Sequence, residues 1–158
     1  MPDLRIRFVT ESGFVAGAIR WVTFSEFSHT ELELPDGTWL GAHAGSGVQI
    51  HPANYYNSVF ERRYAIPLAQ TNYDAAMKYA LAQIGTPYNY SDIAGLLFHR
   101  NMTGKGRAIC SQFVFDVMQA GGLQPLNVLS GYDFRVTPDT LHLSPLFIGR
   151  AYLQTEKP

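Results

Sequence analysis

The order of apolar and polar residues divides the chain into a strand-rich first half and a helix-rich second half. Residues 29–34 alternate with period two, and residues 38–43 resume the alternation after the turn residues Pro35-Asp36-Gly37. This pattern predicts a β-hairpin. Other short runs predict four further strands, at Leu4–Val9, Gly47–Ile50, Arg63–Leu68 and Leu146–Tyr152.

From residue 72 onward the apolar residues recur at helical spacing. A helix is predicted over residues 72–84, with Asn72 as its N-cap and Gly85 as its stop. Its expected buried stripe comprises Ala76, Met77, Ala80, Leu81 and Ile84. Further helices are expected over residues 14–21, 91–98 and 109–120. The sequence therefore predicts a single α+β domain spanning residues 1–158, with an antiparallel sheet packed against helices.

The turn length and the apolar pattern of the hairpin together predict its register. A three-residue turn pairs Leu34 with Thr38 and places His29 opposite His43. One face then carries His29, Glu31, Glu33, Trp39, Gly41 and His43, and the other face is largely apolar. A slip of one residue would mix the two faces. Directly opposed residues have Cβ atoms roughly 4.5–5.5 Å apart, so two imidazoles could hydrogen-bond there. The hairpin by itself favours the alternative in which both histidines lie on a solvated sheet face.

Composition narrows the class of protein. The net charge is −1 and 16% of residues are charged, so the basic excess of a nucleic-acid binder is absent. No apolar stretch approaches the roughly 20 residues that a membrane span needs. The N-terminus lacks the pattern of a secretory signal, so the expected location is the cytoplasm, unless a phage particle or a secretion machine delivers the protein. A single cysteine excludes an intramolecular disulfide.

That cysteine, Cys110, is a candidate nucleophile. It lies in the first turn of a predicted helix, where the positive end of the helix dipole and unpaired N–H groups favour the thiolate. The alternative is a small buried hydrophobe, which is the usual state of a lone cysteine. Zinc accepts the residue types of His29, Glu31, His43 and Cys110, but tight zinc-binding spacings are absent, and the sequence predicts no metal or cofactor.

Four stretches together carry a family resemblance. They are Phe27–Leu32, Gly45–Ile50, Ile84–Tyr90 and Cys110–Val114. Their order, with a histidine on a strand, a polar residue on the next strand and a cysteine at a helix start, resembles the circularly permuted papain-like cysteine hydrolases of the YiiX/YaeF type. These are relatives of the NlpC-type peptidoglycan hydrolases and of lecithin–retinol acyltransferases. The resemblance implies a papain-like, permuted NlpC-type fold.

The resemblance also implies roles for individual residues. Cys110 would be the nucleophile, with its own backbone N–H as an oxyanion donor, and His29 the general base. The third, orienting residue is commonly an acid on the second strand. Residues 40–44 contain no acid, so His43 is the nearest polar candidate and Glu31 is the reserve. Tyr88 and Tyr90 would line the substrate pocket or help hold the oxyanion, unless they are simply packed aromatics.

The implied function is hydrolysis of an amide bond through a thiolate–imidazolium couple and an acyl-enzyme. The implied partner is a peptide or amide-containing substrate, with the peptides of peptidoglycan as one class. Two alternatives remain open at this point. One is a catalytically inactive papain-like domain that serves as a binding module or virion component, and the other is a lipid acyltransferase or thioesterase.

Overall fold

The structure is a computed structural model that describes residues 1–12, 17, 21, 25–55, 58–88, 109–128 and 136–156. Several predicted features lie outside these residues. They are most of the helix expected over residues 14–21, the whole helix expected over residues 91–98, and Tyr90.

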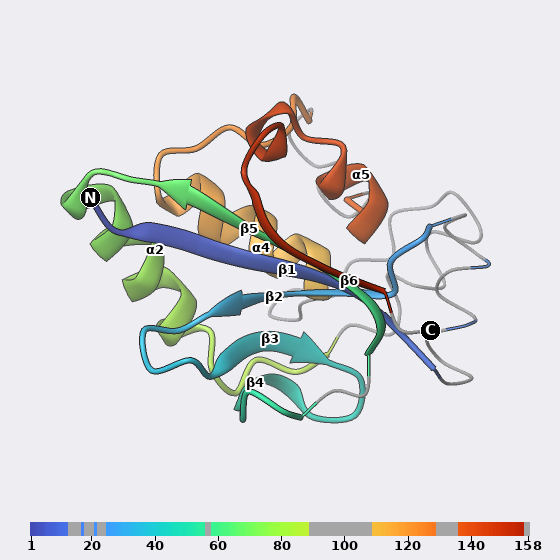
Figure 1. The fold of residues 1–158 in the computed structure, drawn as a ribbon. Coiled ribbons are helices and arrows are strands. Elements are labelled where there is room, and N and C mark those ends of the chain that lie inside the picture. Colours follow the sequence, from blue (N-terminus) through green and yellow to red (C-terminus); the bar gives the residue numbers. More distant parts are fainter. Residues whose placement is uncertain are drawn as a thin grey trace.

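The described strands form one six-stranded antiparallel sheet in the order β4-β3-β2-β1-β5-β6. Figure 1 shows β1 running through the middle of the molecule, with β2, β3 and β4 stepping away on one side. The strands are β1 (Asp3–Glu11), β2 (His29–Glu33), β3 (Trp39–His43), β4 (Gly47–His51), β5 (Ser58–Pro67) and β6 (Ala151–Glu156). Together with the helices this confirms the predicted α+β class.

Helices cover the apolar face of this sheet. They are α2 (Gln70–Ala82), α4 (Cys110–Ala120), the short α5 (Pro138–His142) and a 3-10 turn, η2 (Pro145–Phe147). Helix α4 packs against β2, β3 and α2, and its buried residues Phe113 and Val117 join Leu32 and Leu40 in one hydrophobic core. Because α4 begins with Cys110 and crosses β2, this packing brings the cysteine to the hairpin.

The hairpin register is confirmed. Leu32 pairs with Leu40 and Glu33 with Trp39, and the Leu34 amide donates to the Thr38 carbonyl at 2.8 Å. Counted onward in this register, His29 falls opposite His43, and their ring centroids lie 4.7 Å apart. The predicted apolar face is also confirmed, since Leu32, Leu34 and Leu40 are buried.

The prediction for α2 was wrong in two details. The helix begins at Gln70 with Ala69 as N-cap, so Asn72 lies inside the first turn rather than capping it. Of the expected stripe, Ala76 and Ala80 are buried, whereas Leu81 and Ile84 are 47% and 46% exposed. Helix α2 comes close to the end of α4, because a Cβ at Gly121 would come within 3.1 Å of the Ala76 Cβ. Met77 is partly buried and packs against the core, as the stripe predicts.

The C-terminal prediction was also wrong in its boundaries. The expected strand over residues 146–152 is a 3-10 turn followed by β6, which begins at Ala151. Helix α5 was missed, although Thr137, Pro138 and Thr140 carry its signal. Thr137 and Thr140 form a capping box, and Pro138 occupies the first turn. Strand β5 begins five residues before the predicted Arg63, at Ser58.

Candidate active site

The polar face of the hairpin is buried rather than solvated. Glu31 is fully buried, Trp39 is 1% exposed, and His29 and His43 are each 6% exposed. The expectation of two histidines on a solvated face is therefore wrong. Burying ionisable groups is costly unless they are paired, so the partners of these side chains decide what the cluster can do.

Cys110 is the first residue of α4 and is buried. The N-cap, Ile109, makes no side-chain cap hydrogen bond, and the backbone N–H groups of a first helical turn favour an anion beside them. The neighbouring Ser111 hydroxyl donates to the Val136 carbonyl at 2.5 Å and ties the start of the helix to the following segment. The Cys110 side chain interacts with the His29 imidazole and helps to raise its pKa.

Glu31 lies between the two histidines and a buried arginine. Its Oε1 is 3.2 Å from Nε2 of His29 and 2.9 Å from Nε2 of His43. Its Oε2 accepts from Nε of Arg7 at 2.8 Å and from Nη2 at 2.6 Å. The structure thus joins Cys110, His29, Glu31 and His43 in one contiguous cluster, with the carboxylate touching both imidazoles.

The environment separates the charge states of these groups. Burial alone would lower the pKa of His29, but the charges of Cys110 and Glu31 and hydrogen bonds with both outweigh it and raise the pKa to about 10. Burial would raise the pKa of Glu31, but His29, His43 and Arg7 hold it well below its usual range. Burial lowers the pKa of His43. Near neutral pH the site therefore holds an imidazolium at His29, a carboxylate at Glu31 and a neutral imidazole at His43.

Sequence reasoning missed three neighbours of this cluster. Arg7 lies on β1 directly opposite Glu31, and alternation on β1 gave no hint that an arginine would be buried. His51 faces His43 edge-on at 4.1 Å between ring centroids, and the half-exposed Tyr55 stacks on His51 at 3.8 Å. His51 pairs with Trp39 across β3 and β4. The sequence predicted the strand over residues 47–50 without a pairing register, so it did not place His51 beside this cluster.

Tyr88 is buried and belongs to the hydrophobic core. Its neighbour Thr86 accepts the Val48 amide at 2.9 Å, which fastens this segment to the edge strand β4. These contacts favour the packed-aromatic interpretation of Tyr88, and its expected role in substrate binding stays a prediction. The same role for Tyr90 falls on a residue outside the described part of the chain.

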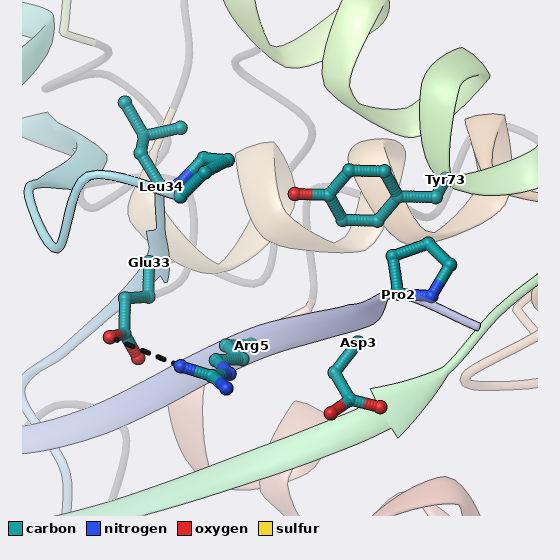
Figure 2. A pocket seen from close by; sticks show the side chains of 7 residues that line it. Pro2, Asp3, Arg5, Glu33, Leu34 and Tyr73 are labelled. Carbon is teal, nitrogen blue, oxygen red and sulfur yellow. Dashed lines mark ion pairs between the residues drawn. The ribbon is translucent and has the colours of Figure 1, made fainter. Parts of the chain in front are cut away.

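A separate hollow of about 200 Å³ lies farther along β1 and β2. Figure 2 shows Tyr73 facing it, with Asp3 below and an ion pair between Arg5 and Glu33. Glu33 is already engaged, because it pairs with Arg5 at 3.7 Å and accepts from the Tyr152 hydroxyl at 2.6 Å. None of the lining residues belongs to the cluster around Cys110.

Comparison with solved structures places the fold. The crystal structure of the metalloprotein YiiX from Escherichia coli O157:H7 superposes with a TM-score of 0.68 over 99% of this chain and 97% of that chain, at 17% sequence identity. No family model and no curated protein matches the chain. Among the described residues no helix has the length and apolarity required to cross a membrane. The chain therefore has a YiiX-like fold.

Proposed function

From this YiiX-like fold and the cluster it carries, we propose that the protein is a papain-like cysteine hydrolase that cleaves an amide bond. Cys110 is the nucleophile, His29 the general acid and base, and Glu31 the residue that orients His29. The observation that carries the proposal is the buried cluster in which His29 interacts with Cys110 at the start of α4 and lies 3.2 Å from Oε1 of Glu31. A nucleophile, a base and a third group that orients the base are the arrangement that nucleophilic catalysis needs.

The reaction begins from a thiolate and an imidazolium. The thiolate attacks the carbonyl carbon, a carbon–sulfur bond forms, and the carbonyl π electrons move to oxygen. The amides at the start of α4, that of Cys110 among them, stabilise this oxyanion. The carbon–nitrogen bond then breaks, and His29 gives its proton to the departing amine.

Hydrolysis of the acyl-enzyme returns the site to its starting state. Neutral His29 takes a proton from water, the hydroxide adds to the acyl carbon, and the thiolate leaves as the acid is released. Glu31 stabilises the imidazolium that forms again, because its carboxylate contacts Nε2 of His29. Ionised Glu31 thus takes the third role, and His43 supports Glu31 through the contact at 2.9 Å.

The substrate class that we propose is a peptide or related amide, the peptides of cell-wall peptidoglycan included. The support is the resemblance of the motifs around His29 and Cys110 to the NlpC-related hydrolases, together with the YiiX-like fold. The two alternative functions predict different results in an activity screen. An inactive binding module would turn over no substrate, and a lipid acyltransferase would act on phospholipid rather than on an amide.

The test combines a reactivity assay with a substrate screen. The rate of Cys110 alkylation by iodoacetamide is measured from mildly acidic to neutral pH in the wild type and in His29→Ala. Purified peptidoglycan, small acyl-amides and phospholipid are then screened with Cys110→Ala as the inactive control. Fast alkylation at mildly acidic pH that depends on His29, with amide turnover that depends on Cys110, is the expected result. Alkylation that follows an ordinary thiol and ignores His29→Ala overturns the proposal.

A second candidate function is a divalent-metal site in the same cluster. One ligand atom each from His29, Glu31 and His43 lies within 4.8 Å of the others, and all three residues are buried. Imidazole nitrogen and carboxylate oxygen are ligands that zinc accepts, and Arg7 on Oε2 would be an outer partner of the carboxylate. These three residues would hold the ion, which when bound would polarise a substrate carbonyl or activate water.

The two candidates compete for His29 and are separable by experiment. Metal content of the purified protein is measured by plasma mass spectrometry, before and after chelation, together with Cys110 alkylation. Stoichiometric metal that is lost in His43→Ala, with slow alkylation until the metal is removed, supports the metal site. Fast alkylation in the metal-containing protein, unchanged by chelation, supports the cysteine hydrolase.

A further inference from the structure

A buried arginine occupies the centre of the sheet, behind the proposed catalytic residues. Arg7 lies on β1, is 2% exposed, and pairs across the strands with Glu31 on β2 and Arg63 on β5. An arginine in this position has been removed from water, a cost that only well-placed partners offset. Hydrophobic residues of similar volume would fill the same space without that cost. Packing alone therefore does not explain why a charged residue is buried at position 7.

The partners of Arg7 fix its guanidinium on three sides. Nε and Nη2 both donate to Oε2 of Glu31, and Nη1 donates to Glu61 at 3.4 Å. The guanidinium also lies over the Trp39 ring, 3.8 Å from its centroid. Glu61 is held in turn by Arg63, whose Nε donates to it at 2.5 Å. A planar guanidinium held in this way presents a fixed pair of N–H groups to the carboxylate.

This arrangement divides the two oxygens of Glu31 between two tasks. Oε2 is occupied by Arg7, and Oε1 is thereby turned toward Nε2 of His29 and of His43. Without the guanidinium, the carboxylate could rotate and offer either oxygen, or neither, to His29. The buried charge therefore sets the direction of the group that orients the proposed base.

We propose that Arg7 is a positioning residue for the reaction, acting through Glu31 to hold the His29 imidazole against Cys110. The inference rests on the proposed function and names a residue that the function by itself does not require. The groups facing Glu31 are Arg7 from β1, His29 from its own strand and His43 from β3, with Cys110 of α4 beyond His29. Glu61 and Arg63 of β5 face Arg7 from the other side.

The chain offers a matched control on the same two strands. Arg5 and Glu33 form a second arginine–glutamate pair one repeat farther along β1 and β2. This pair is separated by 3.7 Å, and the Arg5 side chain is 50% exposed. Arg5→Met removes the same type of charge from the same strand without touching Glu31.

The experiment measures iodoacetamide alkylation of Cys110 at pH 7, and kcat and KM on an amide substrate, in Arg7→Met, Arg7→Lys and Arg5→Met. We expect Arg7→Met to slow alkylation and lower kcat by about 10–100-fold with KM unchanged, as for other residues that orient a functional group. Arg7→Lys keeps the charge without the paired N–H groups and is expected to recover only part of the loss. Arg5→Met should match the wild type.

A double-mutant cycle shows whether Arg7 acts through Glu31. In a Glu31→Gln background, Arg7→Met should have little further effect on alkylation or kcat, because the group that it positions is already gone. Arg7→Lys and the double variant keep the test informative if Arg7→Met alone does not fold. Equal effects of Arg7→Met in both backgrounds, or wild-type alkylation and kcat in a folded Arg7→Lys and Arg7→Met, overturn the inference. An ordinary thiol at Cys110 in the wild type overturns the proposed function instead, so the two failures are distinct.

Discussion

Gly41 lies opposite Glu31 on the neighbouring strand, and a Cβ at position 41 would come within 2.8 Å of the Glu31 Cγ and 3.2 Å of its Oε1. Such an approach is closer than packed carbon atoms allow, so the absent side chain of Gly41 makes the room in which the carboxylate sits. Two imidazoles and a guanidinium then converge on that carboxylate.

Gly41→Ala is therefore expected to displace the Glu31 side chain from His29. Cys110 alkylation at pH 7 and amide turnover should each fall by about 10–100-fold, the usual cost of losing an orienting partner. The Glu31→Gln background supplies the control, because Gly41→Ala should add little there. Unchanged alkylation in a folded Gly41→Ala protein would show that Glu31 tolerates the methyl group and keeps its contacts.

Removal of the carboxylate and removal of the second histidine should have unequal effects. Glu31 contacts His29 directly, whereas His43 is placed to support Glu31. Glu31→Gln should lower kcat by about 10–100-fold, and His43→Ala should lower it less. Both rates are compared by steady-state kinetics, with circular dichroism as a check on folding. A larger loss in His43→Ala would return the third role to His43.

The pH dependence of turnover should have an alkaline limit set by His29. The active form requires the imidazolium, whose pKa is raised to about 10, so turnover should persist above neutral pH and fall as pH rises through about 10. Glu31→Gln removes one of the charges that raise this pKa, so its alkaline limit should move to lower pH. The pH–rate profiles of the two proteins measure this, and coincident alkaline limits would contradict it.

A histidine on the opposite face of the sheet should make stability depend on mild acid. His142 packs on Phe27, and its Nε2 lies 2.6 Å from the Tyr64 hydroxyl. Burial, with the charge of Arg62, lowers the pKa of His142 below the unfolded value of 6.5. The unfolded chain therefore takes up this proton first, and the His142 contribution to stability is lost as pH falls from about 6.5 through the folded pKa.

Urea unfolding at a series of pH values between 8 and 5 tests this prediction. The free energy of unfolding of the wild type should fall more steeply with acidification than that of His142→Phe, which cannot take up the proton. Tyr64→Phe retains the imidazole and should keep the steep dependence. Parallel curves for the wild type and His142→Phe would show that His142 titrates alike in the folded and unfolded chain.

The sequence by itself determined the local features of this protein. Period-two alternation and the turn Pro35-Asp36-Gly37 set the hairpin register, because only one register places Leu32, Leu34 and Leu40 on one face. Helical spacing and the two glycines after Ala120 bounded the helix that begins at Cys110. These signals act between residues close in the chain, so a sequence pattern can carry them.

Tertiary structure decided what the hairpin residues do. Side chains from β1 and β5 decide whether the polar face of the hairpin is exposed to water or buried. The residues of β1 and β5 that contact this face or its partners are far from them in sequence. Arg7 and Glu31 are 24 residues apart, and Arg7 and Glu61 are 54 apart. Alternation assigns a side chain to one face of a strand, but it does not show whether that face is buried. It also does not show that the buried Arg7 pairs with Glu31 on the neighbouring strand. Glu31 was therefore only a reserve candidate from sequence, and packing of β1 against β2 made it the centre of the site.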